Sequence, residues 1–285
     1  MHQNVLKIHL KEKDIILTFK RKNMAKAFGP VQIVGTLDDL NFYITPDGNI
    51  VRERGKTGNT KKSFRENPIF TPVKQHAKDF GLCAKKGVVF RRLVKLFYDC
   101  AKDGSIAGRS NQLLHAIIKE DLEHERGQRQ LHKGLQSEAA LDFLTGFEGN
   151  KGRPLATVLK KKVAFNWSKL EINLKTIYPL RHLDWPENAT QVHLQIAISN
   201  WNCKADTFET SYSNAIVLEK EAGLSKLAFT LEPLQNKDLW LAFVHIKFSS
   251  SLYNAVKVLP NKWNTTTLIG CRRGDIGMCP STGSG

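Results

Sequence analysis

The feature that most constrains the fold is a hairpin pattern in the segment 34–55. Two short runs of strand-forming residues flank Pro46-Asp47-Gly48. Proline presets its own φ, aspartate bonds to nearby backbone and glycine tolerates a positive φ, which together suit a tight turn. The segment therefore predicts an antiparallel β-hairpin, and a run of positive charge follows it.

This basic stretch extends from Arg52 to Lys95. It holds thirteen Lys and Arg residues against three acidic residues, in a chain whose formal net charge is +16. Such a surface attracts phosphate groups or acidic proteins over about 8–10 Å at physiological salt, although a solvated basic face is an equally good interpretation. The residues that we expect to contact a partner subunit or nucleic acid are Arg52, Arg54, Lys61, Lys62, Lys85, Lys86, Arg91, Arg92 and Lys95.

Two amphipathic helices are predicted after the first basic loop. Apolar residues recur at three- and four-residue spacing over about 72–100 and again over about 105–126. Gly81 and Gly87 interrupt the first pattern. We expect the two helices to pack as an antiparallel hairpin, because neither can bury its apolar stripe alone.

The rest of the chain is predicted to be a connector followed by β-structure. Glycines recur over 127–154, where we expect one short helix near 137–143 and a domain boundary near Lys151. Six or seven short strands separated by turn residues then predict an antiparallel, immunoglobulin-like β-sandwich. The fold class is therefore α+β. Its expected parts are a leader or flexible arm (1–23), a hairpin with a basic helical domain (24–150), a β-sandwich (151–272) and a flexible tail (273–285).

Several short segments resemble an uncharacterised protein family of Bacteroidota. The resemblance covers about residues 24–150 and implies a bacterial source and this order of elements, with a natural start near Met24. It implies no activity and no catalytic residues. The segments that carry it are Gly35–Tyr43, Asp47-Gly48, Val51–Gly55, Asn67–Phe70, Asp79–Gly81, Arg126–Arg129 and Leu144–Glu148.

The chain contains no complete set of residues at the spacing typical of a catalytic or metal site. Its five cysteines are scattered without a CxxC pair, so we expect neither a disulfide framework nor a zinc site. Asp121 and His124 have the carboxylate-x-x-His spacing of bundle metal sites, but the element occurs once, and a solvated acidic helix end is the favoured interpretation. The segment 126–129 resembles an anion-binding turn, although a helix C-terminal cap is the favoured interpretation.

These observations favour a non-enzymatic structural or self-assembly protein, in which the basic helical region and β edges mediate subunit contacts. The alternative is nucleic-acid binding through the basic stretch 52–95. We expect no cofactor. The expected partners are further copies of the chain, nucleic acid or an acidic protein surface, and not a membrane. Because no signal peptide is visible, the default compartment is the cytoplasm.

Overall fold

The computed structural model describes residues 24–27, 34–45, 48–54, 60–234, 239–252 and 255–274. The chain divides into two compact units, Met1–Pro68 and Ile69–Gly285, which are described separately. The predicted arm 1–23 and residues 275–285 of the predicted tail lie outside the described residues.

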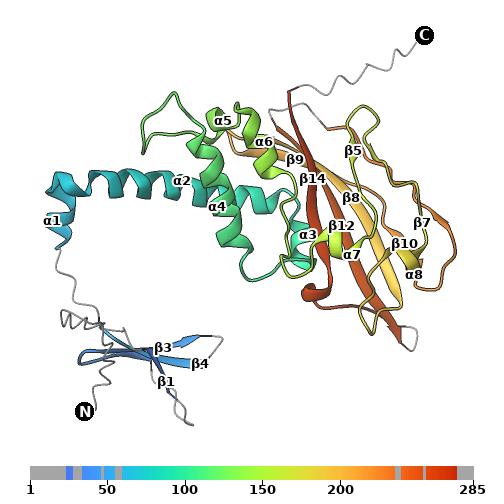
Figure 1. Cartoon of the computed structure of the whole chain (residues 1–285), viewed down its shortest axis with the longest axis horizontal. Coiled ribbons are helices and arrows are strands. Elements are labelled where there is room, and N and C mark those ends of the chain that lie inside the picture. Colours follow the sequence, from blue (N-terminus) through green and yellow to red (C-terminus); the bar gives the residue numbers. More distant parts are fainter. Residues whose placement is uncertain are drawn as a thin grey trace, which may run out of the picture. The chain divides into compact units, whose positions relative to one another are not determined.

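The first unit contains a four-stranded antiparallel sheet in the order β1-β4-β3-β2 (Figure 1). The predicted hairpin is confirmed as β3 and β4, which pair up to Thr45 and Gly48. Its turn residues 46 and 47 lie outside the described residues. Gly48 has a φ of 118°, which favours glycine. The strands are β1 (Met24–Ala27), β2 (Gly35–Leu37), β3 (Leu40–Thr45) and β4 (Gly48–Glu53). The outer strands β1 and β2 were not predicted. A short helix, α1 (Lys61–Glu66), follows the sheet.

The helices of the second unit begin with α2, and the predicted helix 72–100 is in fact two helices. The break falls at Leu93 and Val94, both fully buried, and not at the glycines. At the break the Thr210 hydroxyl donates a hydrogen bond of 2.6 Å to the Leu93 carbonyl, so a strand side chain occupies an acceptor that a continuous helix would use. The second predicted helix ends early, at Lys119. The helices are α2 (Thr71–Arg92), α3 (Lys95–Cys100), α4 (Ile106–Lys119), α5 (Leu131–Gly134), α6 (Glu138–Leu144), α7 (Leu155–Val158) and α8 (Pro179–His182), with 3₁₀ turns at Pro68–Phe70 and Asn261–Trp263.

The second unit is built around one antiparallel sheet of six strands. Its two long central strands, β8 and β12, pair with each other along their length. Strands β9 and β10 pair with β8, and strands β13 and β14 pair with β12. Two small sheets, β7 with β11 and β5 with β6, lie apart from it. The strands are β5 (Phe165–Asn166), β6 (Glu171–Ile172), β7 (Thr176–Ile177), β8 (Gln191–Asn202), β9 (Thr207–Tyr212), β10 (Ile216–Glu219), β11 (Ser225–Lys226), β12 (Leu239–Leu252), β13 (Ala255–Val258) and β14 (Thr265–Arg273). This arrangement confirms the α+β class, but it does not confirm an immunoglobulin-like sandwich, because all the long strands belong to one sheet.

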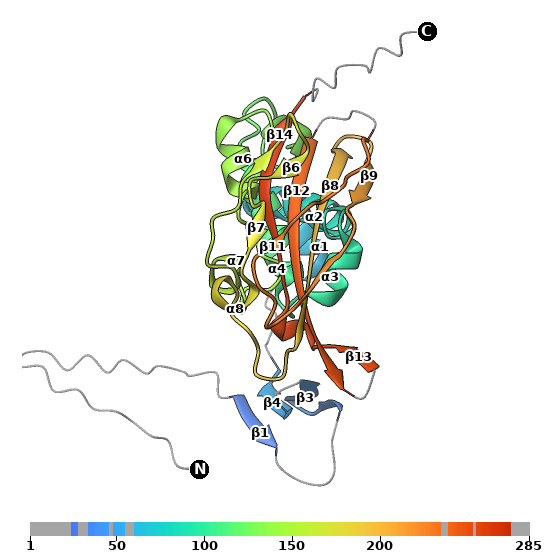
Figure 2. The ribbon, with the colours of Figure 1, turned by 90° about the vertical axis from the view of Figure 1, so that its right-hand side faces the viewer.

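Both faces of the large sheet are covered, and the helices belong to its core (Figures 1 and 2). On one face Phe90 and Ile117 from the helices pack in the same cluster as Trp201 and Phe243 from the strands. On the other face the segments 155–189 and 216–231 supply a second apolar layer. The boundary predicted near Lys151 is therefore wrong: the helices and the sheet each have one apolar face and bury it against the other.

Candidate functional site

Seven of the nine basic residues predicted to contact a partner are exposed. Four of the nine belong to the first unit, where the Arg52 guanidinium lies 5.6 Å from the centre of the Tyr43 ring. Five belong to the second unit, where Lys95 forms an ion pair with Asp99 on the surface of α3. The exposed members are Arg52, Arg54, Lys61, Lys62, Lys85, Arg92 and Lys95.

The remaining two hold the second unit together. Lys86 is only 8% exposed, and its Nζ donates hydrogen bonds to the Cys203 carbonyl at 2.6 Å and to Asp206 Oδ1 at 2.7 Å. The prediction of a surface contact is therefore wrong for Lys86, because the side chain joins α2 to the turn between β8 and β9. Arg91 is partly buried, and its Nη1 donates to Ser110 Oγ on α4 at 2.6 Å.

Asp121 organises the turn that follows α4. Its fully buried carboxylate accepts hydrogen bonds from the backbone N–H of Glu123, His124 and Gln130 at 3.0, 3.2 and 2.7 Å, and lies 2.9 Å from His124 Nδ1. Burial opposes its ionisation, but these donors hold the pKa of Asp121 below the ordinary range. The predicted solvated helix end is thus wrong for Asp121. No group of three metal-ligating side chains occurs among the described residues.

The segment Arg126–Arg129 is docked on α2. Gly127 has a φ of 88°, and a Cβ there would lie 2.9 Å from Gln75 Cα. Its N–H donates to the buried Asp79 carboxylate at 3.0 Å. Because α4 already ends at Lys119, this glycine does not cap that helix, and its role is to let the turn approach α2 closely.

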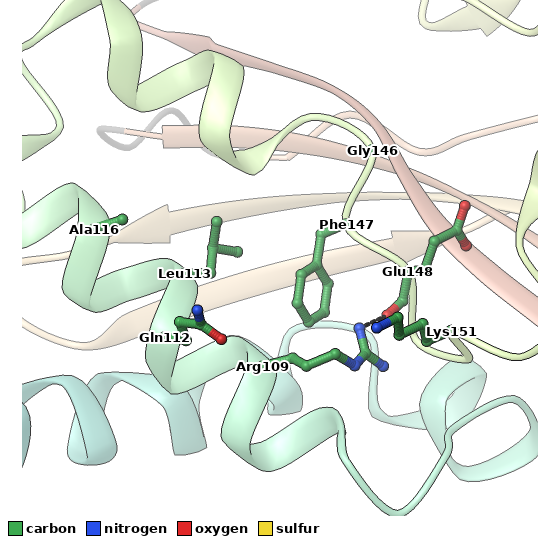
Figure 3. A pocket seen from close by; sticks show the side chains of 8 residues that line it. All are labelled: Arg109, Gln112, Leu113, Ala116, Gly146, Phe147, Glu148 and Lys151. Carbon is green, nitrogen blue, oxygen red and sulfur yellow. Dashed lines mark hydrogen bonds between the residues drawn. The ribbon is translucent and has the colours of Figure 1, made fainter. Parts of the chain in front are cut away.

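A shallow depression of about 410 Å³ lies beside α4 (Figure 3). Arg109 crosses it, 5.2 Å from the centre of the Phe147 ring. All three guanidinium nitrogens are engaged: Nε donates to Ser105 Oγ, Nη1 to the Glu148 carbonyl, and Nη2 to Asp103 and to the Gly149 carbonyl. The lining residues are Arg109, Gln112, Leu113, Ala116, Gly146, Phe147, Glu148 and Lys151.

The Glu148 carboxylate points away from this depression, toward β14 (Figure 3). It accepts hydrogen bonds from Thr267 Oγ1 at 2.5 Å and from the Leu155 N–H at 3.1 Å. Burial raises the pKa of Glu148, and these two donors oppose that rise. Both charged side chains therefore join α4, the segment 146–149 and β14.

The sheet of the first unit has one apolar face. The register places Leu37, Leu40, Phe42, Ile44 and Val51 on the same side, together with the buried Asn49 and, at the end of the sheet, Glu53. Leu37 is 63% exposed and Ile44 is 50% exposed. Within the described part of the first unit, no hydrophobic side chain reaches the buried class.

The opposite face of this sheet is polar at several positions. Thr36 Oγ1 donates to Asn41 Oδ1 at 2.7 Å, and Tyr43 lies beneath Arg52. The sheet is therefore amphipathic and lacks a second layer within the residues that the structure describes. The alternation of Leu40, Phe42 and Ile44 with polar neighbours carried this signal in the sequence, although it was not used to predict a surface.

Comparison with known protein families, curated proteins and solved structures finds no match for this chain. The resemblance to a Bacteroidota family thus stays a hypothesis. Among the described residues, no helix is both long and apolar enough to cross a membrane.

Proposed function

We propose that this chain is a non-enzymatic structural protein that self-assembles through the apolar face of its first unit. We call Leu37, Leu40, Phe42, Ile44 and Val51 the assembly face. The observation that carries the proposal is the amphipathic four-stranded sheet whose apolar residues include the exposed Leu37, Leu40 and Ile44. A small sheet without a covering layer is marginal in water, so its apolar face needs a second layer.

A second copy of the same face is the partner that suits this surface. Apolar sheet faces pack about 10 Å apart with their side chains interdigitated, and a two-fold axis would match each face with its copy. On this side of β3 and β4 the charged residue is Glu53, which lies at the end of the sheet and therefore outside the centre of such a contact. The short edge strands β1 and β2 provide further positions for strand pairing between subunits.

The exposed basic residues have a supporting role in this proposal. Lys61 and Lys62 on α1, together with Arg52 and Arg54, are available to fix the register of subunits against acidic groups. The nucleic-acid alternative has weaker support, because Lys86 and Arg91 are engaged inside the second unit and Lys95 is paired with Asp99.

Light scattering coupled to size-exclusion chromatography tests the proposal, with absorbance recorded at both protein and nucleic-acid wavelengths. We expect the wild-type chain to form an oligomer free of nucleic acid, and Ile44→Lys to reduce it to a monomer by placing a charge in the assembly face. Thr36→Lys adds the same charge to the opposite face of the sheet and should leave the oligomer intact.

Three results would contradict the proposal. A monomeric wild-type chain would reject self-assembly, and equal effects of the two substitutions would reject this face. Particles that carry nucleic acid at low salt and release it at high salt would favour the alternative, because phosphate contacts weaken steeply as salt rises.

A further inference from the structure

Helix α2 of the second unit carries an apolar stripe whose side chains are exposed or only partly buried. Val73, Ala77, Phe80, Ala84 and Val88 recur every three or four residues, which places them on one side of the helix. We call these five residues the α2 stripe. Val73, Phe80 and Val88 are 53%, 48% and 41% exposed. The buried residues of α2, among them Cys83 and Phe90, lie on another side, so the core does not account for this second apolar side.

One flank of the α2 stripe is formed by α4. The helices meet at Gly87, where a Cβ would lie 2.2 Å from Asn111 Oδ1. The His115 ring on α4 lies 6.3 Å from the Phe80 ring and 5.0 Å from the His76 ring, centre to centre. From Val73 to Val88 the stripe is about 22 Å long, at 1.5 Å per residue.

The other flank is basic. Lys78, Lys85 and Arg92 are exposed at seven-residue intervals, about two helical turns apart. None of the ion pairs found among the described residues involves these three side chains. They form a continuous row beside the α2 stripe.

The α4 side of the stripe carries His115 and, close to it, Lys119. Burial lowers the pKa of His115, and the nearby Lys119 lowers it further. The Asp79 carboxylate acts on His115 in the opposite sense, but it is buried and accepts a hydrogen bond from the Gly127 N–H. The low pKa keeps the His115 ring neutral, so the main charge beside the stripe comes from the basic row of Lys78, Lys85 and Arg92, to which Lys119 adds one positive charge.

We propose that the α2 stripe docks an acidic amphipathic helix of another protein. An apolar stripe beside a basic row matches a helix whose apolar residues repeat every three or four positions and whose polar side carries Glu or Asp. A second copy of the same stripe is a poor occupant, because Lys78 and Lys85 would face like charges. Nucleic acid would use the basic row but would gain little from the aliphatic Val73 and Val88.

Fluorescence anisotropy with the full chain tests this proposal. The probe is a labelled peptide of about 18 residues, long enough to span the stripe, with Leu at helical spacing and Glu on its flanks. The same peptide with Lys in place of Glu is the charge control. We expect the Glu peptide to bind, with a Kd that rises with salt, and the Lys peptide to bind at least about tenfold more weakly.

Paired variants locate the binding surface. Val73→Gln with Phe80→Gln should weaken Glu-peptide binding at least about tenfold, whereas Leu180→Gln with Leu224→Gln, at exposed apolar positions elsewhere, should not. Lys78→Gln with Lys85→Gln should weaken binding and reduce its salt dependence, whereas Lys160→Gln with Lys162→Gln removes two exposed charges elsewhere and should change neither.

The proposal is overturned if the stripe variants bind the Glu peptide as wild type does, or if the Lys peptide binds more tightly. Labelled single-stranded DNA is tested in the same assay. If its binding depends on Lys78 and Lys85 but not on Val73 and Phe80, the surface belongs to nucleic acid instead. Phosphatidylserine vesicles, which are anionic, are the third probe. If they bind through the stripe while the Glu peptide does not bind, the stripe is a contact site for a membrane surface. Repeating the assay with Ile44→Lys keeps the result independent of assembly.

Discussion

Two adjacent lysines of α2 have opposite surroundings, and their substitution should separate structural from surface charge. Lys86→Met removes the two hydrogen bonds that the buried Lys86 ammonium donates to the Cys203 carbonyl and to Asp206. We expect this variant to lose about 1–3 kcal/mol of unfolding free energy. Lys85→Met alters an exposed side chain and should change stability by less than about 0.5 kcal/mol.

Urea unfolding followed by circular dichroism measures both variants. Equal stability of Lys86→Met and Lys85→Met would show that the contacts of Lys86 do not contribute to the fold. The pair also shows why the sequence alone misplaced Lys86: its partners lie more than a hundred residues away, on a turn between two strands.

His245 should make the protein less stable in mild acid. Its ring stacks on Phe97 with centres 4.5 Å apart, and its Nδ1 lies 2.8 Å from Thr266 Oγ1. Burial lowers the pKa of His245 to about 3, and the nearby Lys247 adds to the effect. The unfolded chain takes up this proton near pH 6.5, so stability is complete above that pH and falls as pH decreases toward 3, by up to about 1.4 kcal/mol per pH unit.

Unfolding free energies measured in urea at pH 7 and pH 5 test this expectation. His245→Gln should flatten the loss between these two values, whatever its own stability. An unchanged slope in His245→Gln would show that another group controls the acid sensitivity.

At the scale of elements, the local sequence pattern predicted that most helices and strands exist, whereas tertiary contacts determine the residues at which they end. The hairpin and most strands of the large sheet were predictable because turn residues and alternation are local signals. The end of α2 depends on Thr210 of β9, and the turn after α4 depends on the buried Asp121, so neither was visible in the helical pattern. The exposed basic surface was predictable in outline for the same local reason, whereas the assignment of Lys86 to the interior was not.

The approach of α5 to α4 supplies a sharp test at this scale. A Cβ on Gly134 would lie 2.1 Å from the Ile117 carbonyl oxygen, which belongs to the α4 backbone. Gly134→Ala should therefore cost about 1–3 kcal/mol, as overpacking of a close contact does. Gly108 lies inside α4 with open space around its Cβ position, and Gly108→Ala should stabilise the protein by about 0.5–1 kcal/mol.

Thermal unfolding by calorimetry distinguishes these two substitutions by sign. A stability of Gly134→Ala equal to that of wild type would mean that α5 can move away from α4 at little cost. Such a result would make α5 a peripheral turn and not part of the packed layer.

At the scale of the molecule, the buried hydrophobic core found among the described residues lies entirely in the second unit. A chain that lacks residues 1–59 should therefore unfold cooperatively, with a midpoint within about 4 °C of the full chain. The same truncation removes the assembly face and should give a monomer in light scattering. Loss of cooperative unfolding would contradict the independence of the second unit, and persistence of the oligomer would contradict the proposed function.

The place of β14 in the sheet has a consequence for how the protein is made. The segment 146–149 pairs with β14 through Gly146 and Gly149, and Glu148 bonds to Thr267, which is 119 residues further along the chain. At roughly 5–20 residues per second, a ribosome leaves this partner missing for on the order of ten seconds after Glu148 has been added. During that time the strands that bury the apolar side chains of α2, α4 and α6 are not yet complete, so these side chains are exposed. The nascent chain is thus expected to need chaperone protection until synthesis has passed β14.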